Sequence, residues 1–205
     1  MSTTLDLAYP FAGRWLIQNS PANRVPSHGT TWYASSFAID FVPVDASGRT
    51  APITVSSLWY PEPAARFPGF GRPILAPADG VIVAVHDVEP DHAAFRGLPS
   101  IRNALTQARR AAAGWPALAG NHVMIKTSGG TVVALCHLQQ DSIRVDLGQR
   151  VQVGHAVGNC GNTGNSTEPH LHLQAISSQD VTNASAVPIT LHGGLPRNGD
   201  IVEAN

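Results

Sequence analysis

Short strand-like runs separated by glycine-rich turns fill the second half of the chain and most strongly constrain its fold. After Gly120 the runs cover 122–127, 131–138, 150–153 and 170–176, with Ser-Gly-Gly, Leu-Gly-Gln and Gly-Asn-Thr-Gly turns between them. Runs of this length, bounded by such turns, are typical of antiparallel β structure. The sequence therefore predicts a mainly β domain, an antiparallel β-sandwich or open barrel.

The first half of the chain adds further strand signals and one helical signal. Residues 13–18 and 37–42 predict strands, and 73–85 predicts two short strands broken by the Asp79-Gly80 turn. Residues 45–72 hold four of the sixteen prolines and show no sustained period. A serine start, an Ala/Leu/Arg-rich interior and Gly114 as a stop predict one inserted α-helix over 100–113.

The composition is that of one globular domain without a strong electric field. The chain has 205 residues, 43% of them hydrophobic, and its 13 basic and 14 acidic residues nearly cancel. We therefore expect no nucleic-acid partner, and no window approaches the roughly 20 apolar residues of a membrane span. No signal-like segment is visible at the start, so the expected location is cytoplasmic unless the protein is released by lysis or a non-classical route.

Two cysteines, Cys136 and Cys160, are too few for a disulfide scaffold or a thiolate zinc site. Both lie in apolar, strand-like runs, so we expect small buried residues there. Whether they pair is left open, because the sequence does not show the distance between them.

A His-x-His pair, His170 and His172, is the sharpest chemical signal. Alternate residues of a strand face the same side, so both imidazoles emerge together, about 7 Å apart at their bases. Pro169 favours an extended conformation for Glu168, the residue before it, which is a candidate for contact with substrate. The pair predicts a metal or catalytic site at the entrance to a strand.

Three residues elsewhere can complete such a site. His137 ends an apolar strand-like run, His28 follows Pro26 in a loop, and Asp40 interrupts the apolar run 37–42. A buried carboxylate is costly unless it is paired or bound to metal. A catalytic zinc site needs three protein ligands and one open position, which two histidines and a carboxylate provide.

Five ordered motifs resemble the core of the lysostaphin/LytM-type zinc metallopeptidases, across roughly residues 71–176. They are Gly-Asn-His-Val-Met-Ile at 120–125, Ala-Leu-Cys-His-Leu at 134–138, Val-Asp-Leu-Gly-Gln-Arg-Val at 145–151, Gly-Asn-Cys-Gly-Asn-Thr-Gly at 158–164 and Pro-His-Leu-His-Leu-Gln at 169–174. The resemblance implies one zinc ion held by His28, Asp40 and His172. It also implies that His137 and His170 flank the water that the metal activates.

The chain departs from the family pattern between two of the implied ligands. The usual pair is separated by three residues, whereas eleven residues lie between His28 and Asp40, so 29–38 must loop out and return. We expect a single peptidase domain over 1–205, with a core of about 13–42, 71–85 and 120–176. Insertions of about 43–70 and 86–119 are expected to line or cover a cleft, and 177–205 forms a tail.

The resemblance implies hydrolysis of peptide bonds in the stem or cross-bridge peptides of bacterial peptidoglycan. One alternative is a catalytically inactive module of the same fold that binds the cell wall or activates an amidase. Another is a phosphocarrier domain of sugar transport, which also clusters histidines but leaves Asp40 unexplained. The scissile bond and the oligomeric state do not follow from the sequence.

Overall fold

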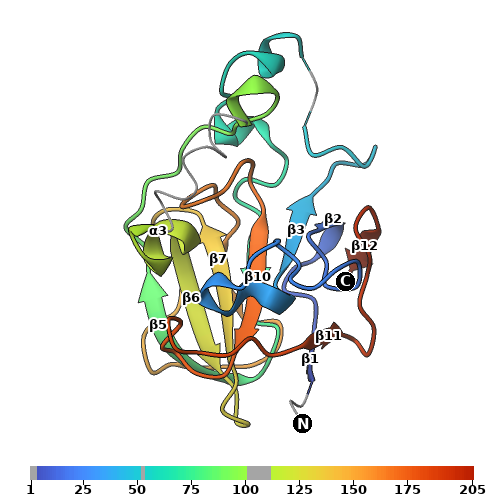
Figure 1. The fold of residues 1–205 in the computed structure, drawn as a ribbon. Helices are drawn as coiled ribbons and strands as arrows, with labels where there is room; N and C mark the ends of the chain where they lie inside the picture. Colours follow the sequence, from blue (N-terminus) through green and yellow to red (C-terminus); the bar gives the residue numbers. More distant parts are fainter. Residues whose placement is uncertain (1–3, 52–53, 101–111) are drawn as a thin grey trace.

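An antiparallel sheet of eight strands forms the centre of the computed structural model, which describes residues 4–51, 54–100 and 112–205. Neighbouring strands in this sheet are all antiparallel. In spatial order they are β12 (Ile201–Ala204), β2 (Gly13–Gln18), β3 (Ile39–Pro43), β10 (Leu171–Ile176), β7 (Val132–Leu138), β6 (Asn121–Lys126), β5 (Gly80–His86) and β8 (Arg150–Val151) (Figure 1).

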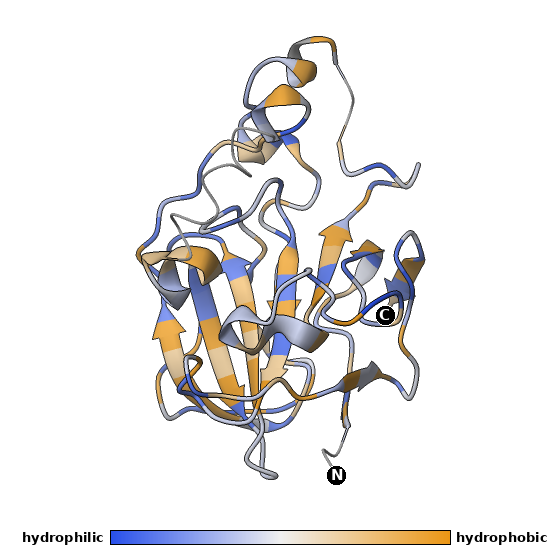
Figure 2. Ribbon diagram, in the orientation of Figure 1, coloured by the Kyte–Doolittle hydropathy of each residue, from blue (hydrophilic) through white to orange (hydrophobic). Residues whose placement is uncertain are grey.

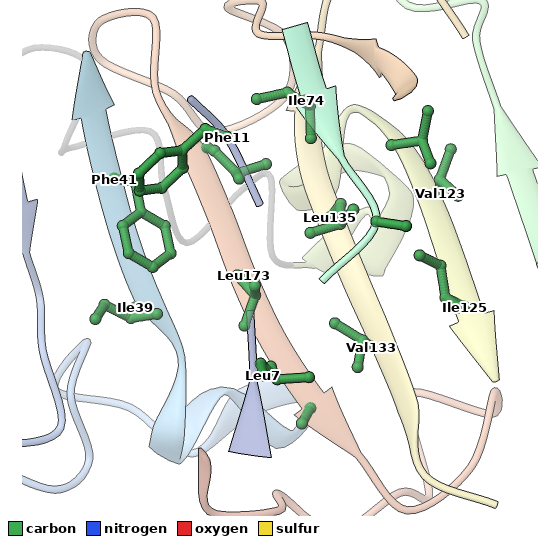
Figure 3. Close-up of a cluster of buried hydrophobic side chains, with 14 of the residues drawn as sticks. Leu7, Phe11, Ile39, Phe41, Ile74, Val123, Ile125, Val133, Leu135 and Leu173 are labelled. Carbon is green, nitrogen blue, oxygen red and sulfur yellow. The ribbon is translucent and has the colours of Figure 1, made fainter. Parts of the chain in front are cut away.

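Two small sheets pack with one face of the large sheet. β1 (Leu5–Leu7) pairs in parallel with β11 (Ile189–Leu191), and β4 (Pro73–Leu75) pairs with β9 (Ala156–Asn159). Alternate residues of the central strands meet them in one apolar core, in which the rings of Phe11 and Trp15 stack at 4.3 Å. Figure 3 shows part of this core, including Leu7, Ile74, Phe41, Leu135 and Leu173.

The opposite face of the sheet is covered by two short helical segments and carries the polar residues. The 3₁₀ segment η1 (Trp32–Phe37) contributes Ala34, and helix α3 (Trp115–Ala119) contributes Ala119, to a second apolar cluster with Ala134 and Cys136. Hydrophilic bands interrupt the apolar strands β3 and β10 in Figure 2. The sheet therefore separates an apolar core from a face that can hold a site.

Parts of both expected insertions lie beyond one end of the sheet, at the top of Figure 1, whereas α3, which ends the second insertion, covers its face. They include the short 3₁₀ helices η2 (Ser56–Leu58) and η3 (Ala64–Arg66) and a small cluster of Ala51, Phe67 and Ala94. The buried carboxylate of Glu62 binds Arg96 at 2.6 Å and Arg66 at 3.6 Å. A separate small core thus stabilises this part of the chain.

The structure confirms the mainly β fold and most of the expected strands. Residue 37 belongs to η1 rather than to a strand, because the chain turns there before entering β3 at Ile39. Most of the helix expected over 100–113 lies outside the described residues. The sequence signals did not indicate β1, β11 or β12, and no described helix has the length and apolarity to cross a membrane.

Candidate metal centre

Asp40 and His172 lie opposite each other on the neighbouring strands β3 and β10. Directly opposed residues of antiparallel strands point to the same face, which brings the carboxylate and the imidazole together. His172 Nδ1 is 2.9 Å from Asp40 Oδ1. The strand pairing therefore builds two-thirds of the predicted ligand set.

His28 reaches the same carboxylate from the loop between β2 and β3. Its Nε2 atom is 3.0 Å from Asp40 Oδ2. The backbone N–H of Ser27 donates to the carbonyl of Ser36 at 3.0 Å, which closes the intervening segment. Residues 29–38 thus loop out and return, as expected from the sequence.

In His28 and in His172, one ring nitrogen contacts Asp40 and the other has a hydrogen-bond partner elsewhere. That partner decides which nitrogen carries the proton and which keeps a lone pair. Ser27 Oγ donates to the carbonyl of Ser35 at 3.3 Å, so it accepts from His28 Nδ1 at 3.0 Å. The Gln174 amide donates to the carbonyl of Tyr33 at 3.0 Å, so its Oε1 accepts from His172 Nε2 at 3.1 Å. In their neutral forms, both histidines therefore turn a lone pair towards Asp40.

Three acceptors facing one another need a cation between them, either a proton or a metal. Burial alone would raise the pKa of Asp40, but His28, His172 and His170 outweigh it and hold the pKa well below the usual range. Burial alone would lower the pKa of His28, but the Asp40 carboxylate outweighs it and raises the pKa. The site thus favours a negative carboxylate and a positive charge beside it.

The spacing of the three groups suits a small tetrahedral metal ion. One ligand atom from each of His28, Asp40 and His172 lies within 4.8 Å of the others. Zinc with bonds of about 2.0–2.1 Å holds its ligand atoms roughly 3.3–3.4 Å apart. His28 Nε2 is 3.0 Å from Oδ2 of Asp40 and His172 Nδ1 is 2.9 Å from Oδ1, so each histidine nitrogen lies near that edge length from one carboxylate oxygen, and this set of two imidazoles and one carboxylate fits zinc.

His137 enters the site through an irregularity in β7. Cys136 pairs with His122 and Leu138 pairs with Asn121, so His137 is one residue in excess opposite β6. Its φ of +64° is in the left-handed region, which non-glycine residues seldom adopt. Simple alternation would put Cys136 and His137 on opposite faces, whereas the bulge lets both line the same cleft.

His137 and His170 lie together beside the three candidate ligands, with ring centroids 4.7 Å apart. The Nδ1 atom of His137 donates to the carbonyl of Thr163 at 2.8 Å, and that of His170 donates to the carbonyl of Glu168 at 2.8 Å. Each ring therefore keeps Nε2 for the cleft, and His170 Nε2 is 3.9 Å from Asp40 Oδ1. Burial, helped by His170 and His172, holds the pKa of His137 well below its usual value, so this ring is neutral.

A cleft of about 320 Å³ opens over these residues. Trp32 and Trp115 form part of its wall, and Trp32 is 53% exposed. Cys136 lines it from beneath, and both cysteines are buried and free, which answers the open question of their pairing. The volume of the cleft is at the lower end of the range of small-ligand sites.

One of the insertions braces the loop that precedes β10. Asp91 accepts the backbone N–H of Asn162 at 2.6 Å and that of Gln140 at 3.0 Å. Phe95 N–H donates to the carbonyl of Thr167 at 2.6 Å. The same loop supplies the Thr163 carbonyl that accepts from His137, so residues 91–95 form a strap that holds this loop in place.

Two residues beside the candidate ligands had no role assigned from the sequence. Asn19 Nδ2 donates to Asp40 Oδ2 at 2.7 Å, and Gln174 binds His172 as described above. Gln174 is two residues beyond His172, so strand alternation could have placed it on the same face. Asn19 follows the end of β2 with a φ of +49°, and its side chain direction had no local signal.

Part of the sequence is similar to known peptidases. Residues 103–184 match Peptidase family M23. The Peptidoglycan DD-endopeptidase ShyA of Vibrio cholerae is 35% identical over 79 residues, which are 38% of this chain and 18% of that protein. The Glycyl-glycine endopeptidase ALE-1 of Staphylococcus capitis is 28% identical over 86 residues, 42% of this chain and 24% of that protein.

The likeness to solved structures is distant. The catalytic domain of lysostaphin from Staphylococcus simulans aligns with 74% of this chain and 77% of that domain, at 18% identity and a TM-score of 0.42. The family match includes His137, His170 and His172, whereas His28 and Asp40 lie before it. Residues 103–184 thus match Peptidase family M23, in line with the resemblance of the sequence to the lysostaphin/LytM-type peptidases.

Proposed function

We propose that the chain is a zinc-dependent metalloendopeptidase that hydrolyses peptide bonds in the stem or cross-bridge peptides of bacterial peptidoglycan. The observation that carries the proposal is the convergence of His28, Asp40 and His172 on one point. Beside it, two further histidines each keep a ring nitrogen for the cleft. Packing alone has no need of five polar groups in this arrangement.

In this proposal His28 Nε2, one oxygen of Asp40 and His172 Nδ1 hold the metal. Gln174 and Asn19 orient His172 and Asp40 through the hydrogen bonds already described. When bound, zinc supplies Lewis acidity, which acidifies water and polarises a carbonyl oxygen. Two histidines and one carboxylate leave the fourth position open for substrate.

His137 and His170 move the protons and bind the developing negative charge. Neutral His137 accepts a proton at Nε2, because its Nδ1 proton is already donated to the Thr163 carbonyl. His170 is oriented in the same way by the Glu168 carbonyl. Protonated rings can then donate to the oxyanion or to the leaving amine, and such groups contribute about 10²–10⁴-fold.

The substrate class rests on the family segment and on the relatives, which are named for two different bonds. One is a peptidoglycan DD-endopeptidase and the other a glycyl-glycine endopeptidase. The chain spans less than a quarter of either relative in these matches. The test substrates must therefore contain both kinds of bond.

Purified protein incubated with zinc should hold about one zinc ion per chain, measured by elemental analysis. It should also release peptides from sacculi with either direct or glycine cross-links, separated by chromatography. Removal of the metal with a chelator should stop the release, and added zinc should restore it. Binding to sacculi without zinc and without hydrolysis would instead favour the inactive wall-binding or amidase-activating module.

A further inference from the structure

Glu168 contributes a carboxylate to the lining of the cleft that holds the proposed catalytic histidines. It lies two residues before His170 in the loop that enters β10, and it lines the cleft. Its backbone carbonyl accepts hydrogen bonds from Ser166 Oγ at 2.7 Å and from His170 Nδ1 at 2.8 Å. The backbone of Glu168 is thus held in place by the same contacts that orient His170.

The side chain of Glu168, unlike its backbone, has an oxygen without a hydrogen-bond partner within the described part of the chain. This atom, Oε2, is buried. Leaving a buried acceptor without a donor destabilises the structure, and more so when the group is charged. A donor that enters the cleft with the substrate and binds this carboxylate would remove the penalty.

The charges around the cleft show which donor would fit. Among the described residues, its lining contains four histidines, Asp40 and Glu168 but no lysine or arginine. Asp40 is surrounded by His28, His172 and Asn19. None of the described ion pairs includes Glu168, so this is the one lining carboxylate whose charge is not matched by a neighbouring side chain.

We propose that Glu168 is a specificity-determining residue that receives a free, positively charged amino group of the peptide substrate close to the scissile bond. The inference rests on the proposed endopeptidase function and adds the chemistry of one substrate group to it. An ammonium group offers three donors and the compensating charge, and charge-assisted hydrogen bonds are about twice as strong as neutral ones. An acylated amine would retain one N–H but lose the charge.

The test uses cross-linked muropeptide dimers with free amino groups and the same dimers after N-acetylation with acetic anhydride. Zinc-loaded wild-type protein should cleave the free-amine dimers with a kcat/KM about tenfold or more above that for the acetylated dimers. Glu168→Gln keeps the shape but removes the charge. It should lower kcat/KM for the free-amine dimers and leave kcat/KM for the acetylated dimers within about threefold of wild type. The ratio of kcat/KM for free-amine dimers to that for acetylated dimers should then be close to one.

Glu203→Gln makes the same change on an exposed residue of β12 and serves as the matched control, with the wild-type ratio expected. Equal cleavage of both dimers by wild type overturns the inference while leaving the endopeptidase intact. An equal loss of kcat/KM on both dimers in Glu168→Gln, with zinc retained, also overturns it and shows a role in the chemical step.

If wild type cleaves neither dimer, the proposed endopeptidase function fails, and the inference about Glu168 is tested by measuring binding of the two dimers by calorimetry. A preference for the free amine that Glu168→Gln abolishes supports Glu168 as the receptor, and equal or absent binding refutes it.

Discussion

His28 Nε2 lies 3.0 Å from Asp40 Oδ2, although the two residues stand twelve positions apart in the chain. The intervening segment leaves the sheet, forms η1 and returns to β3, where Asp40 faces His172 on β10. One ligand candidate thus comes from a loop and two from paired strands. Substitutions can separate the metal-binding role proposed for these three residues from the catalytic role proposed for His137 and His170.

Removal of a metal ligand should abolish zinc binding and hydrolysis together. We expect this for Asp40→Ala, His172→Ala and His28→Ala, because each leaves two of three ligands and a buried unpaired group. Zinc content and peptide release from sacculi are measured on the same preparation. His155→Ala, which alters an exposed histidine, should behave as wild type. Retention of metal and activity in His28→Ala would show that the third ligand lies elsewhere.

Substitution of the other two histidines should separate metal binding from catalysis. His137→Ala and His170→Ala leave all three candidate ligands in place, so zinc content should stay near that of wild type. Hydrolysis should fall by about two orders of magnitude or more, the scale of lost proton-transfer or oxyanion groups. If His170→Ala loses zinc while His172→Ala keeps it, the roles of the His-x-His pair are reversed.

Gln174 should tune zinc affinity without touching the ion. Gln174→Leu removes the acceptor for His172 Nε2 and should weaken zinc binding about 10–100-fold in a chelator competition. Gln174→Glu keeps an acceptor oxygen for that N–H and should bind zinc more tightly than the leucine variant. Equal affinity of the two variants would mean that the hydrogen bond does not orient His172.

Loss of the strap contacts should slow the chemical step without loss of the metal. Asp91→Ala releases Asn162 N–H and Gln140 N–H, which loosens the loop that positions His137. We expect kcat to fall about tenfold with normal zinc content, since small misplacements of catalytic groups are costly. Asp87→Ala is the matched control, because Asp87 accepts from Ile143 N–H, away from that loop. Similar losses in both variants would argue against a positioning role for Asp91.

His122 should make folding stability depend on pH. Burial lowers its pKa from 6.5 to about 4, with the ring under Trp115 and 6% of the residue exposed. Between pH 6.5 and 4 the unfolded chain binds a proton that the folded chain does not, so stability falls as the pH falls through this window. The full effect of the pKa difference is roughly 3 kcal/mol.

This prediction is checked by urea unfolding of zinc-free protein at pH 7.5 and 4.5. The stability of His122→Phe relative to wild type should improve by roughly 2–3 kcal/mol at the lower pH. His155→Phe, which alters an exposed position, should show no such change relative to wild type. An equal difference at both pH values would contradict the assignment.

Local patterns in the sequence were enough to predict the mainly β fold, the strands that carry Asp40 and His172, and the shared face of His170 and His172. These features depend on alternation along a strand and on turn residues, which act over a few positions. The same patterns did not indicate β1, β11 or β12, because these short strands owe their pairing to partners far along the chain.

Only the tertiary structure decided how the remaining groups reach the site. His137 faces the cleft because β7 has an extra residue opposite β6, and Asn19 reaches Asp40 through the pairing of β2 with β3. The strap contacts join residues about 50 to 70 positions apart. Register shifts and long-range hydrogen bonds depend on which segments meet in space, and no local pattern of residues encodes that meeting.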